Sequence, residues 1–122
     1  MLLNDFFMID SLQKDDTTAK ATLRLNAEHP IFKGHFPGQP VVPGACLLQL
    51  VQEMTSLITA KEWRLLKGDH IKFIAMIDPR VNKIVEMTVT CKEIGTGDLQ
   101  ASAELSDGSA VCFKFKGTFR SV

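Results

Sequence analysis

The chain has 122 residues, of which 45% are hydrophobic and 23% charged, and this composition is typical of one soluble globular domain covering residues 1–122. Its 14 basic and 14 acidic side chains cancel, so the net charge gives no electrostatic sign of binding to nucleic acid or to an anionic membrane. A domain of this size buries a modest fraction of its surface, and association with a second copy would enlarge its core.

The amino-terminal third alternates between apolar segments and polar breaks. Residues 5–12 form a short apolar segment that fits either a strand or a turn of helix. Residues 17–25 alternate and are rich in threonine, which predicts a half-buried strand. Residues 26–42 contain several prolines and glycines, and we expect them to form an irregular loop.

An apolar helix is predicted next. Pro43 and Gly44 open it, because proline is well tolerated in a first helical turn, and the pattern continues to about Lys61. The apolar side chains lie almost all round this helix, so it should be buried. They are Leu47, Leu48, Leu50, Val51, Met54, Leu57 and Ile58.

The second half of the chain is a series of predicted strands. We expect them at residues 70–77, 83–94, 99–105 and 110–119. Asp107 and Gly108 favour a tight hairpin, because an Asp-Gly pair suits the turns that match strand twist. The short turns predict a mostly antiparallel sheet of five or six strands. The expected fold is therefore α+β, an antiparallel sheet wrapped around one long central helix.

The cysteines and the amino terminus bear on the cellular compartment. Cys46, Cys91 and Cys112 are odd in number and widely spaced, which argues against a disulfide framework and a zinc site and fits a reducing compartment. Residues 1–10 do not resemble a signal peptide, and no apolar run reaches the roughly 18 residues that span a bilayer. These features predict a cytoplasmic protein without a membrane segment.

The predicted helix has one polar stripe. Gln49, Glu53 and Ser56 stand at i, i+4 and i+7 and share one side. On a buried helix such a stripe faces solvent, a subunit interface, or a site shared with the loop before the helix. Gly44 favours the last reading, because the first amides of a helix have no partner within it and would polarise a carbonyl oxygen placed against them.

The loop before the helix holds a candidate catalytic histidine. His35 lies between Gly34 and the Phe36-Pro37 pair, just before the helix, and the glycines and prolines around it fit stiff turns. His29 and His70 lack such a setting, and we interpret them as structural.

The segment GHFPGQPVVPG, residues 34–44, resembles the active-site signature of the β-hydroxyacyl-[acyl carrier protein] dehydratases of the FabZ and FabA type. These enzymes have the hotdog fold. The strong resemblance covers residues 29–54, and the order of the predicted elements agrees over nearly the whole chain. The motif is specific, because histidine, phenylalanine, proline and glycine in this order are followed at fixed spacing by the proline and glycine of the helix start.

The resemblance implies roles for individual residues. His35 would remove a proton from C2 of a β-hydroxyacyl thioester, since an imidazole with an ordinary pKa suits reversible proton transfer at neutral pH. The backbone N–H of Gly44 would stabilise the charge that develops on the thioester oxygen. Phe36 and Pro43 flank these two groups and are expected to contact the substrate.

The resemblance also implies partners. The acyl chain would arrive on the phosphopantetheine arm of acyl carrier protein, in fatty-acid or related acyl-chain biosynthesis. Two copies of the chain would form a homodimer, or a higher homo-oligomer, with an acyl tunnel between subunits. Members of this family require no metal and no bound cofactor of their own.

The chain departs from the family at the acid. Fourteen residues after the motif histidine the family has an acidic residue, and here that position is Gln49, which cannot supply a proton by ionisation. Glu53 stands four residues on, where FabZ-type enzymes usually have glutamine. Our hypothesis is that Glu53 takes part of the acid role, directly or through water, although one helical turn of about 5.4 Å separates the positions.

Three hypotheses follow from Gln49 and Glu53. The first is that the chain is a dehydratase. The second is a non-catalytic or heterodimer-partner hotdog subunit that binds acyl chains or acyl carrier protein, and the third is a thioesterase that uses Glu53 to activate water. Chain-length preference depends on tunnel depth, for which Phe73, Met76 and Met87 are the candidate residues.

Overall fold

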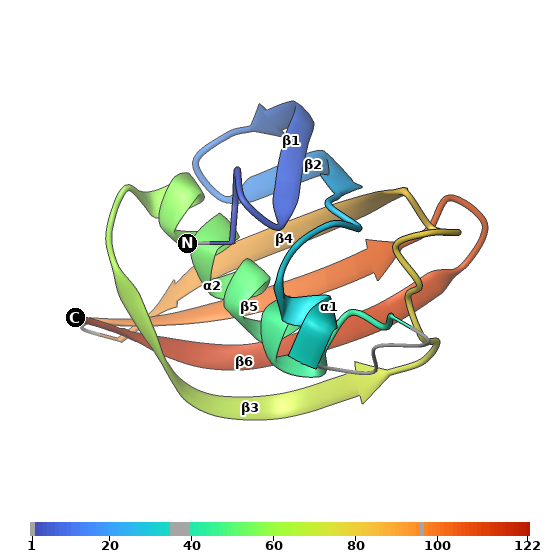
Figure 1. Cartoon of the computed structure of the whole chain (residues 1–122). Coiled ribbons are helices and arrows are strands. Elements are labelled where there is room, and N and C mark those ends of the chain that lie inside the picture. Colours follow the sequence, from blue (N-terminus) through green and yellow to red (C-terminus); the bar gives the residue numbers. More distant parts are fainter. Residues whose placement is uncertain (1, 35–39, 96) are drawn as a thin grey trace.

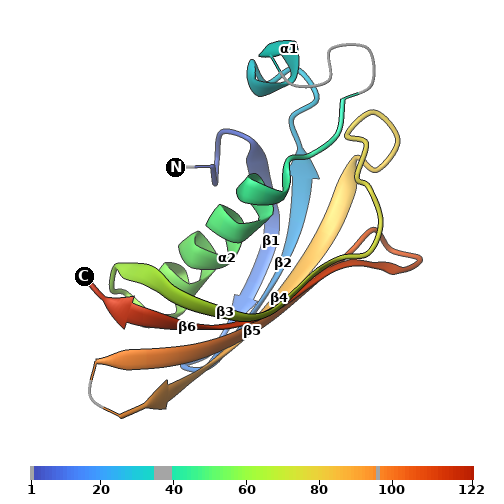
Figure 2. The same ribbon diagram turned by 90° about the horizontal axis from the view of Figure 1, so that it is seen from below.

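The computed structural model describes residues 2–34, 40–95 and 97–122, in which a six-stranded antiparallel sheet wraps around one long helix (Figures 1 and 2). The predicted α+β class is confirmed. The elements are β1 (Phe7–Lys14), β2 (Thr18–Leu25), α1 (Ile31–Gly34), α2 (Gly44–Thr59), β3 (Trp63–Phe73), β4 (Ile84–Ile94), β5 (Asp98–Ser106) and β6 (Val111–Ser121). The strand order across the sheet is β1-β2-β4-β5-β6-β3.

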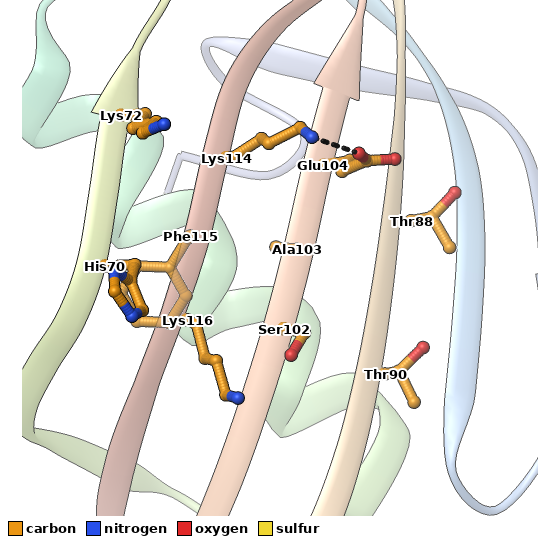
Figure 3. A pocket seen from close by; sticks show the side chains of 10 residues that line it. All are labelled: His70, Lys72, Thr88, Thr90, Ser102, Ala103, Glu104, Lys114, Phe115 and Lys116. Atoms are coloured by element: carbon orange, nitrogen blue, oxygen red, sulfur yellow. Dashed lines mark ion pairs between the residues drawn. The ribbon is translucent and has the colours of Figure 1, made fainter.

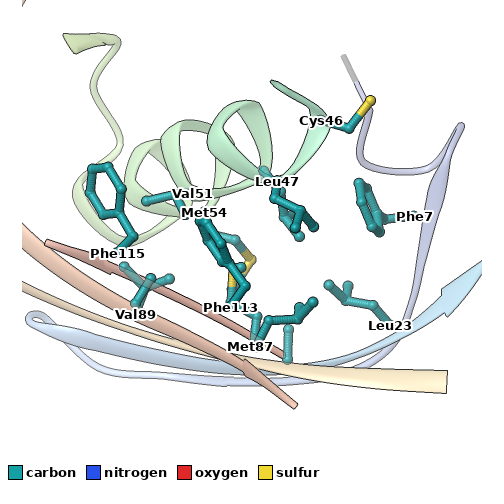
Figure 4. Close-up of a cluster of buried hydrophobic side chains, with 14 of the residues drawn as sticks. Phe7, Leu23, Cys46, Leu47, Val51, Met54, Met87, Val89, Phe113 and Phe115 are labelled. Atoms are coloured by element: carbon teal, nitrogen blue, oxygen red, sulfur yellow. The ribbon is translucent and has the colours of Figure 1, made fainter. Parts of the chain in front are cut away.

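The core lies between α2 and one face of the sheet. Side chains alternate along the strands, so over most of β2, β4, β5 and β6 every second residue points toward α2 and is buried. Figure 4 shows Leu47, Val51 and Met54 of α2 above Met87 and Phe113 of the sheet. Each such side chain contributes about 1.5–3 kcal/mol when it is fully buried. The predicted burial of this helix is confirmed.

The strand predicted at residues 70–77 is wrong in its bounds. Strand β3 begins at Trp63, ends at Phe73 and forms an edge of the sheet, paired only with β6. Its register shifts twice, between Leu65 and Lys67 and between Gly68 and His70. These irregularities and the exposure of every residue after Trp63 remove the alternation that marks a strand in a sequence.

Smaller differences concern the loop and the helix end. The region predicted as loop contains the one-turn helix α1. Helix α2 ends at Thr59 rather than near Lys61, because Ala60 adopts a left-handed φ of 56° and its N–H donates to the C=O of Ser56 at 2.8 Å. The first apolar segment, for which the sequence allowed either a strand or a turn of helix, forms strand β1. Within the described ranges, no helix combines the length and apolar character needed to cross a membrane.

Candidate active site

Helix α2 begins without a side-chain cap. Pro43, at the N-cap position, is extended (φ −63°, ψ 143°) and offers no hydrogen bond to the first turn. The N–H of Val42 donates to the C=O of Ile77 at 2.9 Å, which fixes the approach to the helix. No residue of the described ranges accepts a hydrogen bond from the N–H of Gly44. This amide, at the positive end of the helix dipole, is therefore available to a carbonyl oxygen.

The polar stripe of α2 is organised by Glu53. The side-chain N–H of Gln49 donates to Oε2 of Glu53 at 2.9 Å, and only the amide nitrogen of Gln49 can face a carboxylate in this way. Glu53 is buried, with 8% of its surface exposed. The orientation of Gln49 is thus fixed, and its carbonyl oxygen and second N–H remain for other partners.

The amino-terminal segment completes this arrangement. The N–H of Leu2 donates to Oε2 of Glu53 and the N–H of Leu3 donates to Oε1, both at 2.9 Å. No sequence pattern indicates these bonds, because backbone donors carry no residue identity and these two lie about 50 residues from Glu53. Three N–H donors therefore surround the Glu53 carboxyl group, from Leu2, Leu3 and Gln49.

A cavity of about 600 Å³ lies beside the polar stripe. It is lined by α2, by the start of β3 and by the last residue of the chain, namely Ala45, Leu48, Gln49, Gln52, Glu53, Ser56, Glu62, Trp63, Leu65 and Val122. Its volume is in the range of small-molecule sites, and its lining combines apolar side chains with a few polar groups. The predicted stripe therefore faces a hollow that begins next to Gly44.

The two residues with the most specific sequence signal lie outside the described residues. These are His35 and Phe36, which directly follow α1. The start of α1 is held by His29, whose Nδ1 accepts the N–H of Ile31 at 3.1 Å. The proton of His29 is then on Nε2, which donates to Asp5 at 3.1 Å. These contacts agree with the structural interpretation of His29.

A second hollow lies on the opposite face of the sheet. Its volume is about 500 Å³, and Figure 3 shows Lys72, Lys116 and His70 around it, with Lys114 paired to Glu104 at 3.5 Å. Lys114 and Lys116 alternate with buried residues of β6 that point toward α2, and Lys72 and His70 are paired with them in register. The sheet therefore separates this hollow from the polar stripe. These lysine and histidine side chains are exposed to solvent. We place the candidate site at α2 rather than here.

The cysteine nearest to the site lacks the features of an activated nucleophile. Cys46 follows Gly44 by two residues, is buried, and burial raises the pKa of its thiol. All three cysteines are buried and free. Among the described residues, the groups available for binding substrate include the amide N–H of Gly44 and the oriented side-chain amide of Gln49. Together they can bind a carbonyl oxygen and a hydroxyl group.

Comparison with known proteins bears on these features. A family model described as ApeI dehydratase, of the ApeI-like family, matches residues 11–112. The FabZ 3-hydroxyacyl-[acyl-carrier-protein] dehydratases of Klebsiella pneumoniae and of Salmonella newport are each 28% identical over 102 residues, covering 76% of this chain and 67% of theirs.

Solved structures show the same fold. The dehydratase heterocomplex ApeI:P from Xenorhabdus doucetiae has a TM-score of 0.76 at 19% identity, covering 93% of this chain and 97% of that one. A hypothetical thioesterase with coenzyme A from Streptococcus pneumoniae has a TM-score of 0.71 at 10% identity, covering 98% and 89%. The expected hotdog fold is confirmed.

Proposed function

The chain belongs to the ApeI-like dehydratase family, and on that premise we propose that it removes water from a 3-hydroxyacyl thioester carried on acyl carrier protein. The product would be a trans-2-enoyl thioester. The observation that carries the proposal is the start of α2, where the N–H of Gly44 has no acceptor among the described residues and where the next residue, Ala45, lines a cavity of about 600 Å³. A donor placed in this way stabilises negative charge on a thioester oxygen.

The residues act in order along the substrate. His35 takes the C2 proton while the N–H of Gly44 binds the thioester oxygen, and Pro43 and Phe36 contact the acyl thioester beside them. The C3–O bond then breaks, and Gln49 holds the departing hydroxyl by hydrogen bonds. The proton that His35 takes from C2 is the one that the leaving hydroxide needs to become water. The reaction therefore balances without a second acid.

Glu53 has two conceivable roles. That Glu53 supplies a proton stays a prediction. Its three N–H donors favour another role, in which the Glu53 carboxyl group orients Gln49. We propose this positioning role for Glu53.

A second hotdog chain is the proposed partner at strand β3. This strand is an edge of the sheet, and its side chains Leu65, Leu66 and Ile71 are 36%, 47% and 37% exposed in the single chain. A long edge strand with exposed apolar side chains is a template for pairing with another strand. In a homodimer or a higher homo-oligomer, this edge strand would pair with a second copy of the chain. The three buried thiols fit the cytoplasm as the compartment.

Gln49 supports one alternative. A chain without the family acid is suited to a mixed dimer, in which a different hotdog subunit supplies the carboxylic acid. The similar protein from Xenorhabdus is named as a heterocomplex. In this case the purified chain binds acyl carrier protein but is inactive until the second subunit is added. Hydrolysis, the third hypothesis, would instead release the carrier thiol.

The test is a mass measurement on 3-hydroxyacyl-[acyl carrier protein] incubated with the purified chain. Loss of one water from the acyl group is the expected result, and His35→Ala should lower the rate about 10²- to 10⁴-fold. His70→Ala is the matched control, because His70 lies on the opposite face of the sheet and should leave the rate unchanged. An unchanged rate in His35→Ala would exclude the proposed base.

A further inference from the structure

Strand β3 runs antiparallel to α2 along its whole length. At its start, the indole N–H of Trp63 donates to Thr59, near the end of the helix. At its end, Phe73 reaches the first residue of the helix. A Cβ atom added to Gly44 would lie 2.8 Å from Cζ and 2.9 Å from Cε1 of Phe73. A larger residue at this position would therefore displace the Phe73 ring.

The ring of Phe73 packs against another side chain but is also largely exposed to solvent in the single chain. Its ring stacks on Phe113 with centroids 5.3 Å apart and an interplanar angle of 28°. In the single chain 56% of Phe73 is nevertheless exposed. The bond between Val42 and Ile77 holds the segment after β3 alongside the approach to α2. The aromatic ring of Phe73 thus borders Gly44 at the start of α2.

The other two candidates for substrate selection lie elsewhere. Met87 is fully buried in the core beneath α2, where Figure 4 shows it, and Met76 is 78% exposed beyond the end of β3. Of the three residues suggested by the sequence, only Phe73 lies against Gly44.

We propose that Phe73 determines specificity at C2 of the substrate, by filling the space beside the N–H of Gly44 so that only acyl thioesters without a C2 branch fit. This inference rests on the proposed function, because it takes Gly44 as the carbonyl site. C2 is bonded directly to that carbonyl carbon. In the proposed arrangement a methyl branch on C2 meets the ring of Phe73, which already occupies the position of a Cβ atom on Gly44.

Binding of unreactive analogues tests the inference without requiring turnover. The probes are the amide analogues of 3-hydroxybutyryl-pantetheine and of its 2-methyl derivative, titrated calorimetrically into the full chain. The wild type should bind the unbranched analogue at least about tenfold more tightly, the scale of one methyl group in a tight pocket. In Phe73→Ala this discrimination should disappear, while the unbranched analogue still binds.

Ile74→Ala is the matched control, because Ile74 is similarly exposed at 52% and the three atoms nearest to the Cβ position of Gly44 all belong to Phe73. It should keep the discrimination. The inference is overturned if Phe73→Ala retains the preference, or if neither analogue binds. Binding with the expected discrimination but no loss of water from the thioester would instead refute only the proposed function.

A double-mutant cycle tests the contact itself. Gly44→Ala should lower the melting temperature in the wild type and have little effect in a Phe73→Ala background, because the ring that the methyl group meets is gone. Equal losses in both backgrounds would show that Phe73 does not restrict this space.

Discussion

The two ends of helix α2 are built in opposite ways. At the carboxyl end, the N–H of Ala60 donates to Ser56, the Trp63 indole donates to the hydroxyl of Thr59 at 2.6 Å, and Gln52 donates to the C=O of Trp63 at 2.7 Å. At the amino end, Pro43 provides no cap and the N–H of Gly44 has no acceptor in the described ranges.

This difference separates stability from function. Buried polar groups are normally hydrogen-bonded, and no buried side-chain nitrogen or oxygen of the described residues lacks a partner. The amino end of α2, which has no cap, departs from this pattern of satisfied polar groups. Departures of this kind concentrate at functional sites. The closed end of α2 should therefore respond to mutation through folding, and the open end through activity.

The largest effect on folding is expected at the closed end. Trp63 is 3% exposed, and Trp63→Ala should lower the free energy of unfolding by about 3–5 kcal/mol through the cavity that it leaves. Trp63→Phe is the control that keeps most of the ring and removes the N–H donor to Thr59, at a cost of about 1 kcal/mol. Urea denaturation measures both. A loss below 1 kcal/mol in Trp63→Ala would show that this end does not anchor the helix.

A smaller effect is expected between the two ends, at Glu53. Glu53→Ala leaves the N–H groups of Leu2 and Leu3 without their acceptor and should cost about 1–3 kcal/mol for each donor that stays buried. Glu53→Gln retains one carbonyl oxygen and should cost less. Glu62→Ala is the control, because Glu62 lines the same cavity but is exposed. If Glu53→Ala and Glu62→Ala have equal stability, Glu53 does not anchor the amino-terminal segment.

Local sequence patterns predicted the elements whose signals are local. The alternation of residues 83–94 and 99–105 predicted β4 and β5, and Pro43-Gly44 predicted the first residues of α2. Asp107-Gly108 predicted the last hairpin, in which Gly108 has a φ of 97° that suits glycine. Each of these signals depends on backbone geometry over a few residues, and each was correct.

The rest depends on contacts between distant parts of the chain. The pattern of β3 is obscured because an edge strand with two register shifts is largely exposed. The Glu53 bonds involve backbone N–H groups, and the contact of Phe73 with Gly44 joins a strand end to a helix start. The hydrophobic periodicity of a sequence does not indicate contacts of this kind. The motif around His35 was recognised through its resemblance to a family, not through a predicted geometry.

The open end of α2 is tested most directly by comparing Gly44→Pro with Gly44→Ala. Both add a Cβ atom beside Phe73, but only proline removes the N–H, and it is compatible with a first helical turn and with the extended Pro43 before it. The measurement is the rate of water loss from 3-hydroxyacyl-[acyl carrier protein], with melting temperatures confirming that both variants are folded. Our account predicts a rate about 10²- to 10³-fold lower in Gly44→Pro than in Gly44→Ala. Equal rates in the two variants would contradict it.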